Sequence, residues 1–345
     1  MKKFKFRISK EQSSEIIIAK DIDLNSVLNR IDHDKKLLIT DENIYKIFRK
    51  TLNKLPVLLL KPGREKNLSD VEKIIDFLVR NNFSRKSLLI AFGGGRITDI
   101  VGFVASIYMR GINWIDLPTT GLSQIDASVG GKTGIDFKGI KNLIGSFHFP
   151  KITIINPLYT LSQDDFEFEE IIGELVKYLL IMPRESSKRL EKLMEYIAQR
   201  NVEAIKKAIE ICIGFKLEIV KKDPFDNKGI REILNLGHTA AHAIEEINKI
   251  PHGYAVWYGL YYITKLSEKL NILKNKDIIN LFTDNYKLEK NLLTHKDPKR
   301  FLKLITADKK RKDHKNYFLL IKDFSKIKPV SNINENLIIK TYLEL

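Results

Sequence analysis

The first 157 residues alternate short apolar runs with helical patterns, and this alternation constrains the fold most. Amphipathic patterns typical of helices cover residues 24–31 and 44–52. Apolar runs of strand length flank them, at residues 3–8, 16–19, 37–40 and 57–60. Strands that alternate with helices predict an α/β domain with a mostly parallel sheet.

The alternation continues through a glycine turn. An amphipathic helix is expected over residues 70–81, a buried strand over 88–92 and a second helix over 97–109. The strand ends at Gly93-Gly94-Gly95, so free N–H groups at the helix start can face an anion. The turn lacks the GxGxxG dinucleotide pattern, and a tight turn that serves packing alone is the alternative.

The chain changes character near Asn156-Pro157. Residues 113–117 and 152–155 are the last expected strands, and from residue 161 onward apolar residues recur with helical spacing. We therefore predict an α/β domain at residues 1–157 and an all-α domain, a helical bundle, at residues 158–345.

The segment 119–145 is rich in glycine and carries four polar side chains, Asp126, Lys132, Lys141 and Asn142. Glycines let a backbone approach a ligand closely, and lysines beside such a backbone favour an anionic, oxygen-rich small molecule. A nucleotide-triphosphate loop is excluded, because Asp126 stands where that motif needs a glycine. A mobile surface loop is the alternative.

The net charge of +16 does not by itself indicate nucleic-acid binding. The lysines are spread along the chain without an aromatic-interleaved basic block, so no nucleic-acid partner is predicted, and attraction of anionic substrates is the weaker functional interpretation. No apolar run reaches the roughly 18 residues that span a bilayer, and the first residues lack the apolar region of a signal peptide. A single cysteine, Cys212, fits a reducing cytoplasm. We expect a cytoplasmic protein without a membrane span.

The helical half holds a set of candidate metal ligands. His238 and His242 are four residues apart on one expected helix face, His252 follows Pro251, and Glu174 lies upstream. Glu174, His238 and His252 would form a nitrogen-and-oxygen metal site with open positions, as catalytic sites have. The HExxH glutamate is missing, which excludes that metalloprotease pattern. A structural histidine pair and a solvated Glu174 are the alternative.

Two further polar positions have both a functional and a structural interpretation. Arg231 can clamp a carboxylate or phosphate, or form a surface ion pair. Asp41 follows a strand at the edge where α/β sheets bind ligands, or it caps the next helix.

Together these segments resemble the 3-dehydroquinate synthase family of sugar-phosphate cyclases over roughly residues 41–320. Metal-dependent alcohol dehydrogenases share the glycine turn and a histidine pair, but not the GGKTG…KN segment. The resemblance is carried by GGGRITDIVGFVASIYMRG, LPTTGLSQIDASVGGKTGID, KNLIG, GELVKY, LNLGHTAAHAIE, PHG and ADKK.

The resemblance implies an NAD-bound, dinucleotide-binding α/β domain, a helical zinc domain and a cleft between them. It implies conversion of DAHP, the phosphorylated seven-carbon sugar acid of the shikimate route, to 3-dehydroquinate. NAD takes a hydride from the carbinol, phosphate leaves, the hydride returns, and the ring opens and recloses by an aldol step.

The resemblance also assigns roles to individual positions. Glu174, His238 and His252 match the ligands of zinc, for which cobalt or another divalent metal could substitute. Arg110 matches an arginine that the family contributes across a homodimer interface, and either Lys309 or Lys310 matches its phosphate-contacting lysine. The substrate positions are Asp126, Lys132, Asn142, Lys177, Lys216, Arg231, Asn235 and His242. The NAD positions are Asp41, Gly94, Gly95, Asp99, Thr119, Thr120 and Lys141, with Glu65 a weaker match.

Four positions depart from the family pattern. Leu68 replaces a ribose-contacting lysine, and Leu179 replaces a glycine. Thr98 replaces a glycine beside the dinucleotide turn, where a hydroxyl can still cap the helix. Tyr254 replaces a glutamate beside His252, whose orientation then needs another partner. The alternatives to DAHP conversion are a sister cyclase acting on another sugar phosphate and a catalytically silent paralogue.

Overall fold

The structure is a computed structural model that describes residues 1–345 apart from 10–11, 53–54, 289–290 and 307–315. Residues 1–164 and 200–225 form a first compact unit, and residues 165–199 and 226–345 form a second. The units differ from two continuous halves because the helix α8, Val202–Lys222, groups with the first unit.

The first unit is built on a seven-stranded sheet in the order β1-β2-β9-β6-β5-β3-β4. All pairs are parallel except β1 with β2. The interior strand β5 is buried along its whole length, as expected for a parallel sheet covered on both faces. The predicted α/β fold is confirmed. The strands are β1 Lys2–Arg7, β2 Ser13–Ile18, β3 Lys36–Asp41, β4 Val57–Leu60, β5 Leu88–Gly93, β6 Asn113–Pro118 and β9 Ile152–Ile155.

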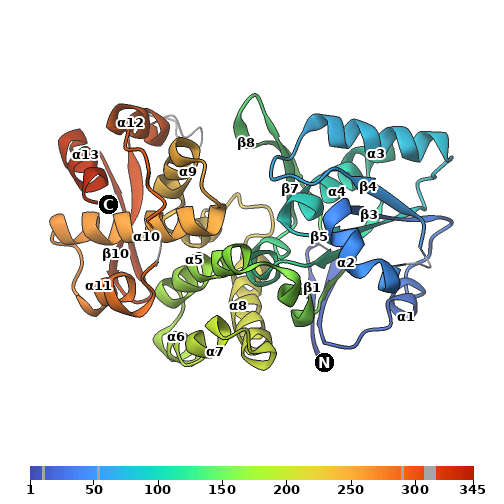
Figure 1. Ribbon diagram of the computed structural model, residues 1–345, viewed down its shortest axis with the longest axis horizontal. Helices are drawn as coiled ribbons and strands as arrows, with labels where there is room; N and C mark the ends of the chain where they lie inside the picture. The colour runs from blue at the N-terminus through green and yellow to red at the C-terminus, as the bar shows by residue number, and fades with distance from the viewer. Residues whose placement is uncertain (10–11, 53–54, 289–290, 307–315) are drawn as a thin grey trace. The chain divides into compact units, whose positions relative to one another are not determined.

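Helices cover both faces of this sheet (Figure 1). The helices α3, Leu68–Arg80, and α4, Gly95–Ile107, pack on one face through Val71, Ile74 and Ile100. On the other face, α1, Leu24–Leu28, and α2, Glu42–Leu52, pack against the sheet through side chains such as Leu28 and Leu52. The carboxyl ends of the parallel strands therefore form one open edge. Short turns of the first unit are η1 Tyr108–Arg110, η2 Ser123–Ala127 and η3 Pro157–Ser162.

The glycine-rich segment is more ordered than a loop. After the short π-helix η2, residues Lys132–Phe137 form β7 and Ile140–Phe147 form β8, an antiparallel hairpin. Gly134 and Gly145 face each other, and a Cβ on Gly145 would lie 2.5 Å from the carbonyl oxygen of Thr133. The glycines thus allow close strand pairing, and the interpretation of this stretch as a mobile loop is wrong for the hairpin residues.

The second unit is mainly helical, as predicted, with one added hairpin of β10, Tyr317–Asp323, and β11, Lys326–Ser331. Residues 229–247 do not form one continuous helix, because Gly237 has a φ of 78° and separates the 3₁₀ turn η4, Ile230–Asn235, from α9. The helices are α5 Asp165–Ile181, α6 Arg184–Glu191, α7 Met194–Ala198, α9 His238–Asn248, α10 His252–Lys269, α11 Asp277–Asn280, η5 Leu281–Asn285, α12 Pro298–Thr306 and α13 Glu335–Leu343.

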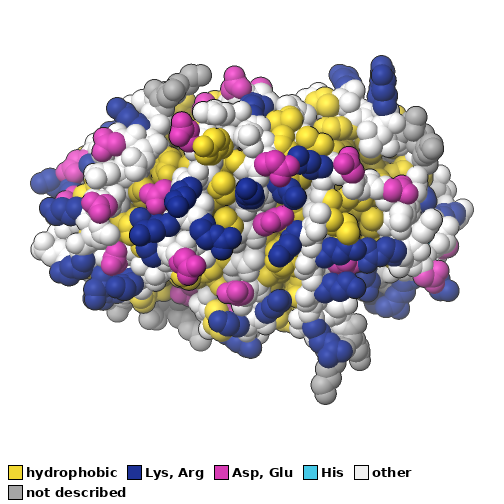
Figure 2. Space-filling view, turned by 90° about the horizontal axis from the view of Figure 1, so that it is seen from below, with side chains coloured by type: hydrophobic (Ala, Val, Ile, Leu, Met, Phe, Trp, Pro, Cys, Tyr) yellow, Lys and Arg dark blue, Asp and Glu magenta, His cyan; other side chains and the backbone are white. Residues whose placement is uncertain are grey.

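The surface carries basic side chains without a single dominant patch in the face that Figure 2 shows, where Lys and Arg are scattered among acidic and apolar groups. Within the described ranges, none of the helices is both long enough and apolar enough to cross a bilayer.

Candidate functional site

Three side chains of the second unit converge on one point. The Oε1 atom of Glu174 lies 3.6 Å from Nε2 of His238 and 3.6 Å from Nε2 of His252. The three candidate ligand atoms all lie within 4.8 Å of one another. One carboxylate and two imidazoles with room for further ligands fit a catalytic zinc site or that of a similar divalent metal.

Two close helix crossings bring these ligands together. A Cβ on Gly173 of α5 would lie 1.9 Å from the carbonyl oxygen of Gly253 in α10, so only glycine permits this approach. Glu174 directly follows Gly173, and His252 directly precedes Gly253. At the second crossing, a Cβ on Gly259 of α10 would lie 2.4 Å from the carbonyl oxygen of Gly237. His238 comes directly after Gly237, so each ligand adjoins a contact point between helices.

The other ring nitrogens of the two histidines have partners. Nδ1 of His238 lies 3.1 Å from the carbonyl oxygen of Leu236, and Nδ1 of His252 lies 3.3 Å from Oε2 of Glu245. These oxygens accept hydrogen bonds, so each Nδ1 donates a proton and each Nε2 lone pair is left for a cation. His252 has its carboxylate partner in Glu245 and not at position 254. The Tyr254 hydroxyl donates to Glu169 instead, at 2.7 Å.

Burial and charge act on these groups in opposite directions. Burial lowers the pKa of His238 to about 3, against the attraction of Glu174. Burial also lowers the pKa of His252, but hydrogen bonds to Glu174 and Glu245 outweigh it and raise that pKa to about 10. A proton on His252 thus balances the carboxylates in the metal-free protein. A divalent cation would displace this proton, since metal ligands bind deprotonated.

Of the remaining predicted residues of the second unit, His242 and Lys177 adjoin the triad. The His242 ring lies 5.6 Å from that of His238, and Lys177, fully buried, pairs with Oε2 of Glu174. Arg231 is 3% exposed, so the surface ion-pair interpretation is wrong for it. Asn235 follows in the same 3₁₀ turn, η4. Lys309 and Lys310 lie outside the described residues.

The predicted NAD positions of the first unit gather at the open edge of the sheet. Asp41 ends β3, Gly94 follows β5, and Thr119 follows β6; these three strands are adjacent and parallel. Gly94 precedes α4 without a side-chain cap, so the first N–H groups of that helix remain available to an anion. A Cβ on Gly94 would meet the Thr120 methyl at 3.0 Å, which keeps this turn tight.

Three predicted contacts also have local structural roles. Oδ1 of Asp41 accepts hydrogen bonds from the backbone N–H groups of Asn43 and Ile44, both at 2.9 Å, so the capping interpretation is confirmed. The Glu65 side chain is exposed, and its backbone carbonyl accepts from Arg96 at 2.7 Å. Contact of either side chain with NAD stays a prediction. The Thr98 hydroxyl donates to the carbonyl of Gly95 at 3.2 Å and does not cap the N-terminus of α4.

The predicted substrate residues of the first unit come from three elements. Lys216 of α8 donates to Oδ1 of Asp126 at 2.9 Å and to its backbone carbonyl at 2.8 Å, which fixes η2 against α8. Lys132 is exposed at the start of β7, and Lys141 and Asn142 are exposed on β8. These side chains remain solvated and can meet an anionic ligand.

Lys66 was not among the residues predicted from the sequence. Its ammonium group lies 2.9 Å from Oδ2 of Asp99 and also donates to Oδ1 of Asn142. It joins a predicted NAD position to a predicted substrate position. A lysine in a charged loop carries no local signal for such a role, because both partners are distant in the sequence.

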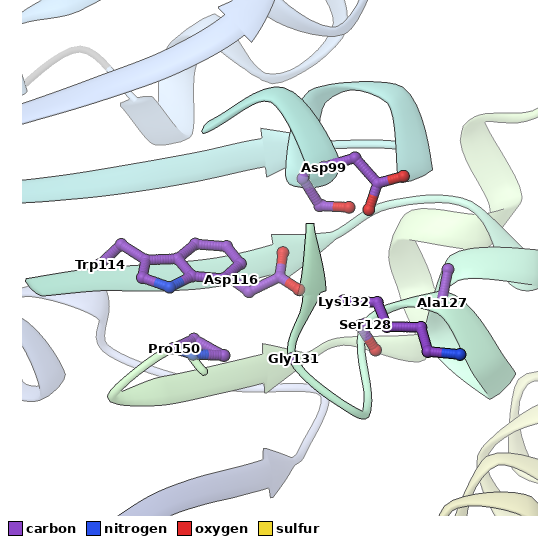
Figure 3. Close-up of a pocket in the computed structure, with 9 residues that line it drawn as sticks. Asp99, Trp114, Asp116, Ala127, Ser128, Gly131, Lys132 and Pro150 are labelled. Carbon is purple, nitrogen blue, oxygen red and sulfur yellow. The ribbon is translucent and has the colours of Figure 1, made fainter. Parts of the chain in front are cut away.

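The first unit also contains a small polar cavity, which is lined by Asp99, Asp116, Ser128 and Lys132 among others (Figure 3). Its volume is ≈ 10 Å³, which is about enough for one water molecule. Burial raises the pKa of Asp99 despite the pull of Lys66. Burial, reinforced by Asp99, raises the pKa of Asp116 well above its usual range, which disfavours the ionised form of this carboxyl group.

Comparison with known proteins adds sequence relatives. A family model described as 3-dehydroquinate synthase N-terminal matches residues 57–169, and one described as 3-dehydroquinate synthase C-terminal matches residues 172–311. The 3-dehydroquinate synthase of Clostridium tetani is 37% identical over 326 residues, covering 90% of this chain and 86% of the relative. That of Clostridium acetobutylicum is 36% identical over 335 residues, covering 91% and 92%.

Comparison with solved structures shows the same fold. A 2-deoxy-scyllo-inosose synthase complexed with carbaglucose-6-phosphate, NAD+ and Co2+ superposes with a TM-score of 0.86 at 22% identity, covering 99% of this chain and 100% of that one. A 2-epi-5-epi-valiolone synthase from Streptomyces hygroscopicus with NAD+ and Zn2+ bound has a TM-score of 0.83 at 21% identity, covering 98% and 99%.

Proposed function

The chain belongs to the 3-dehydroquinate synthase family, and from that premise we propose that it converts DAHP to 3-dehydroquinate and phosphate. The enzyme is then a phosphate-eliminating cyclase, a carbon–oxygen lyase, that uses NAD and a divalent metal. The observation that carries the proposal is the convergence of Glu174, His238 and His252 with both Nδ1 atoms already engaged.

The two cofactors supply chemistry that amino-acid side chains lack. A divalent metal bound by the triad would polarise the substrate oxygen that becomes a ketone, as a Lewis acid. NAD, bound at the glycine turn after β5, supplies a reversible hydride acceptor. The proposed division is a cofactor domain at residues 1–157 and a metal- and substrate-binding domain at residues 158–345.

The protein's own residues position the substrate and stabilise charge. In this proposal, buried Arg231 binds the carboxylate through its planar guanidinium group, and the ammonium groups of Lys132 and Lys216 offset negative charge on the substrate. Charge on the departing phosphate grows as its bond breaks, and preorganised cations favour that state over the ground state. Asn142, Lys177, Asn235 and His242 complete the proposed set, with Asp126 orienting Lys216.

We also propose a homodimer in which Arg110 reaches the partner's site. Arg110 and its neighbour Met109 have left-handed backbone, with φ values of 65° and 48°. Ile107 and Met109 are 44% and 47% exposed beside it. Exposed apolar side chains beside a strained turn are stabilised when another subunit buries them, which supports a subunit interface here.

The test is turnover by the purified protein. With NAD, zinc or cobalt, and DAHP, we expect phosphate release in step with 3-dehydroquinate. A panel of sugar phosphates without a carboxylate serves as the control. Product from one of those alone would replace DAHP conversion with a sister cyclase activity, and metal and NAD binding without any product would indicate a silent paralogue.

A further inference from the structure

The Lys66 side chain ties together three elements of the first unit. It lies in the segment before α3, yet its ammonium group contacts Asp99 on α4 at 2.9 Å and Asn142 on β8. A second carboxylate, that of Asp136 on β7, lies 4.0 Å away. The Lys66 side chain is only 13% exposed, so these contacts form largely out of solvent.

Backbone hydrogen bonds fix this ammonium group in place. The Lys66 N–H donates to Oδ2 of Asp136 at 3.2 Å, and the Asp136 N–H donates to the Lys66 carbonyl at 2.9 Å. Oδ1 of Asp136 also accepts from the Asn142 N–H at 2.9 Å, which holds Asn142 at a φ of 52°. The left-handed backbone and the side chain of Asn142 are therefore both held by the Lys66–Asp136 pair.

Charge makes this arrangement sensitive to the loss of Lys66. The Asp99 side chain is 24% exposed, and its partial burial raises its pKa. Lys66 opposes this increase most strongly, with a smaller contribution from Lys216, while Asp136 adds to it. A buried carboxylate without a cation either takes up a proton or turns toward solvent. Without Lys66, Asp99 would lose the charge or the orientation that a ligand contact needs.

We propose that Lys66 is a positioning residue that holds Asp99 on the cofactor side and Asn142 on the substrate side in one fixed geometry. The ligands assigned to the two sides rest on the proposed function, whereas the three-way contact does not. Neither ligand needs to touch Lys66. A substitution of Lys66 then weakens NAD binding through Asp99 and substrate binding through Asn142.

The cofactor side is tested by NAD titration without substrate. Lys66→Met is expected to weaken NAD binding on the order of tenfold, which corresponds to about 1.4 kcal/mol. Lys66→Arg should restore most of the affinity, because its guanidinium can reach the same oxygens. In an Asp99→Asn background, Lys66→Met should change the affinity by less than about twofold, because contacting residues are non-additive.

The substrate side is tested by steady-state kinetics with DAHP. Lys66→Met should raise KM for DAHP with a smaller change in kcat, as expected when a binding geometry is loosened. Lys73→Met is the matched control, since Lys73 lies on the exposed face of α3 and donates to the Leu59 carbonyl at 2.7 Å. Lys66→Gln, which keeps a donor, serves if the methionine variant does not fold.

The outcomes separate this inference from the proposed reaction. Additive effects of Lys66→Met and Asp99→Asn, or unchanged NAD affinity in Lys66→Met, would overturn the positioning role. Normal NAD binding by wild type with non-additive variants, but no 3-dehydroquinate, would support the role and contradict only the reaction. Wild type that binds no NAD would overturn both.

Discussion

The metal triad of the second unit and the proposed anion-binding segment of the first unit meet opposite physical requirements. Glu174 is 1% exposed and sits where two helices touch through glycines. Lys132 and Lys141 stand exposed on a hairpin. A metal site needs ligands held within tenths of an ångström, and helix packing supplies this rigidity. An ammonium group that awaits an anion stays hydrated, because burying it unpaired costs several kcal/mol.

The largest effect should come from removing a triad ligand. His238→Ala leaves one imidazole and one carboxylate, so the Lewis-acid contribution is lost and turnover should fall on the order of 10³-fold or more. Metal analysis of the purified variant should show loss of stoichiometric metal. His295→Ala, an exposed histidine of the same unit, is the control. Full metal content in His238→Ala would contradict the role of His238 as a metal ligand.

The next effect concerns the partner of His252. Glu245→Ala should weaken metal binding about 10- to 100-fold, the usual cost of losing a hydrogen bond that orients a ligand. Competition with a chelator measures this affinity. Glu246→Ala is the matched control, because that neighbour pairs with Lys249 and Arg300 on the surface. Equal affinities in the two variants would contradict the orienting role.

A smaller effect is expected at the exposed hairpin. Lys132→Met should raise KM for DAHP about tenfold, since a charge-assisted hydrogen bond contributes roughly 1.5–3 kcal/mol and solvent screening reduces this. Lys138→Met, at the hairpin turn, should leave KM unchanged. The increase in KM caused by Lys132→Met should shrink at high salt, whereas the loss of turnover in His238→Ala should not. A salt-independent KM would argue against an exposed ammonium contact.

The smallest effect is a change in stability with pH at Asp116. The raised pKa disfavours ionisation of this carboxyl group in the folded state, whereas the unfolded state loses the proton above about pH 3.9. Wild-type stability therefore falls as pH rises, by at most about 1.4 kcal/mol per pH unit from this group. Asp116→Asn cannot ionise, so its Tm should exceed that of wild type by more at pH 7 than at pH 5.

Asp34 provides a control of opposite sign for the Asp116 measurement. Hydrogen bonds from Ser84 and Ser87 lower the pKa of Asp34, so its stabilising contribution is present above the unfolded pKa and is lost on acidification. Asp34→Asn should lower Tm at pH 7, with a gap that closes toward low pH. The same sign of pH dependence in both variants would contradict the two assignments.

The sequence by itself determined the layered architecture. Apolar runs such as 88–92 and 113–117 became the neighbouring strands β5 and β6, because burial on both faces demands continuous apolar residues. Helical spacing likewise predicted most of the second unit. The glycine-rich hairpin was not predicted. Its glycines indicate that the backbone is conformationally free, but they do not show which segment pairs with which as strands.

The residue types of the site were also readable, but their convergence was not. Local patterns identified Glu174, His238 and His252 as candidates, and resemblance to a family selected them over a structural histidine pair. Only the tertiary structure decided that Gly173 meets Gly253, that Glu245 rather than a neighbour of His252 holds its ring, and that Lys66 joins Asp99 to Asn142. Hydrophobic periodicity is local and survives in the sequence; a hydrogen bond between residues 33 or 76 positions apart depends on how the chain packs.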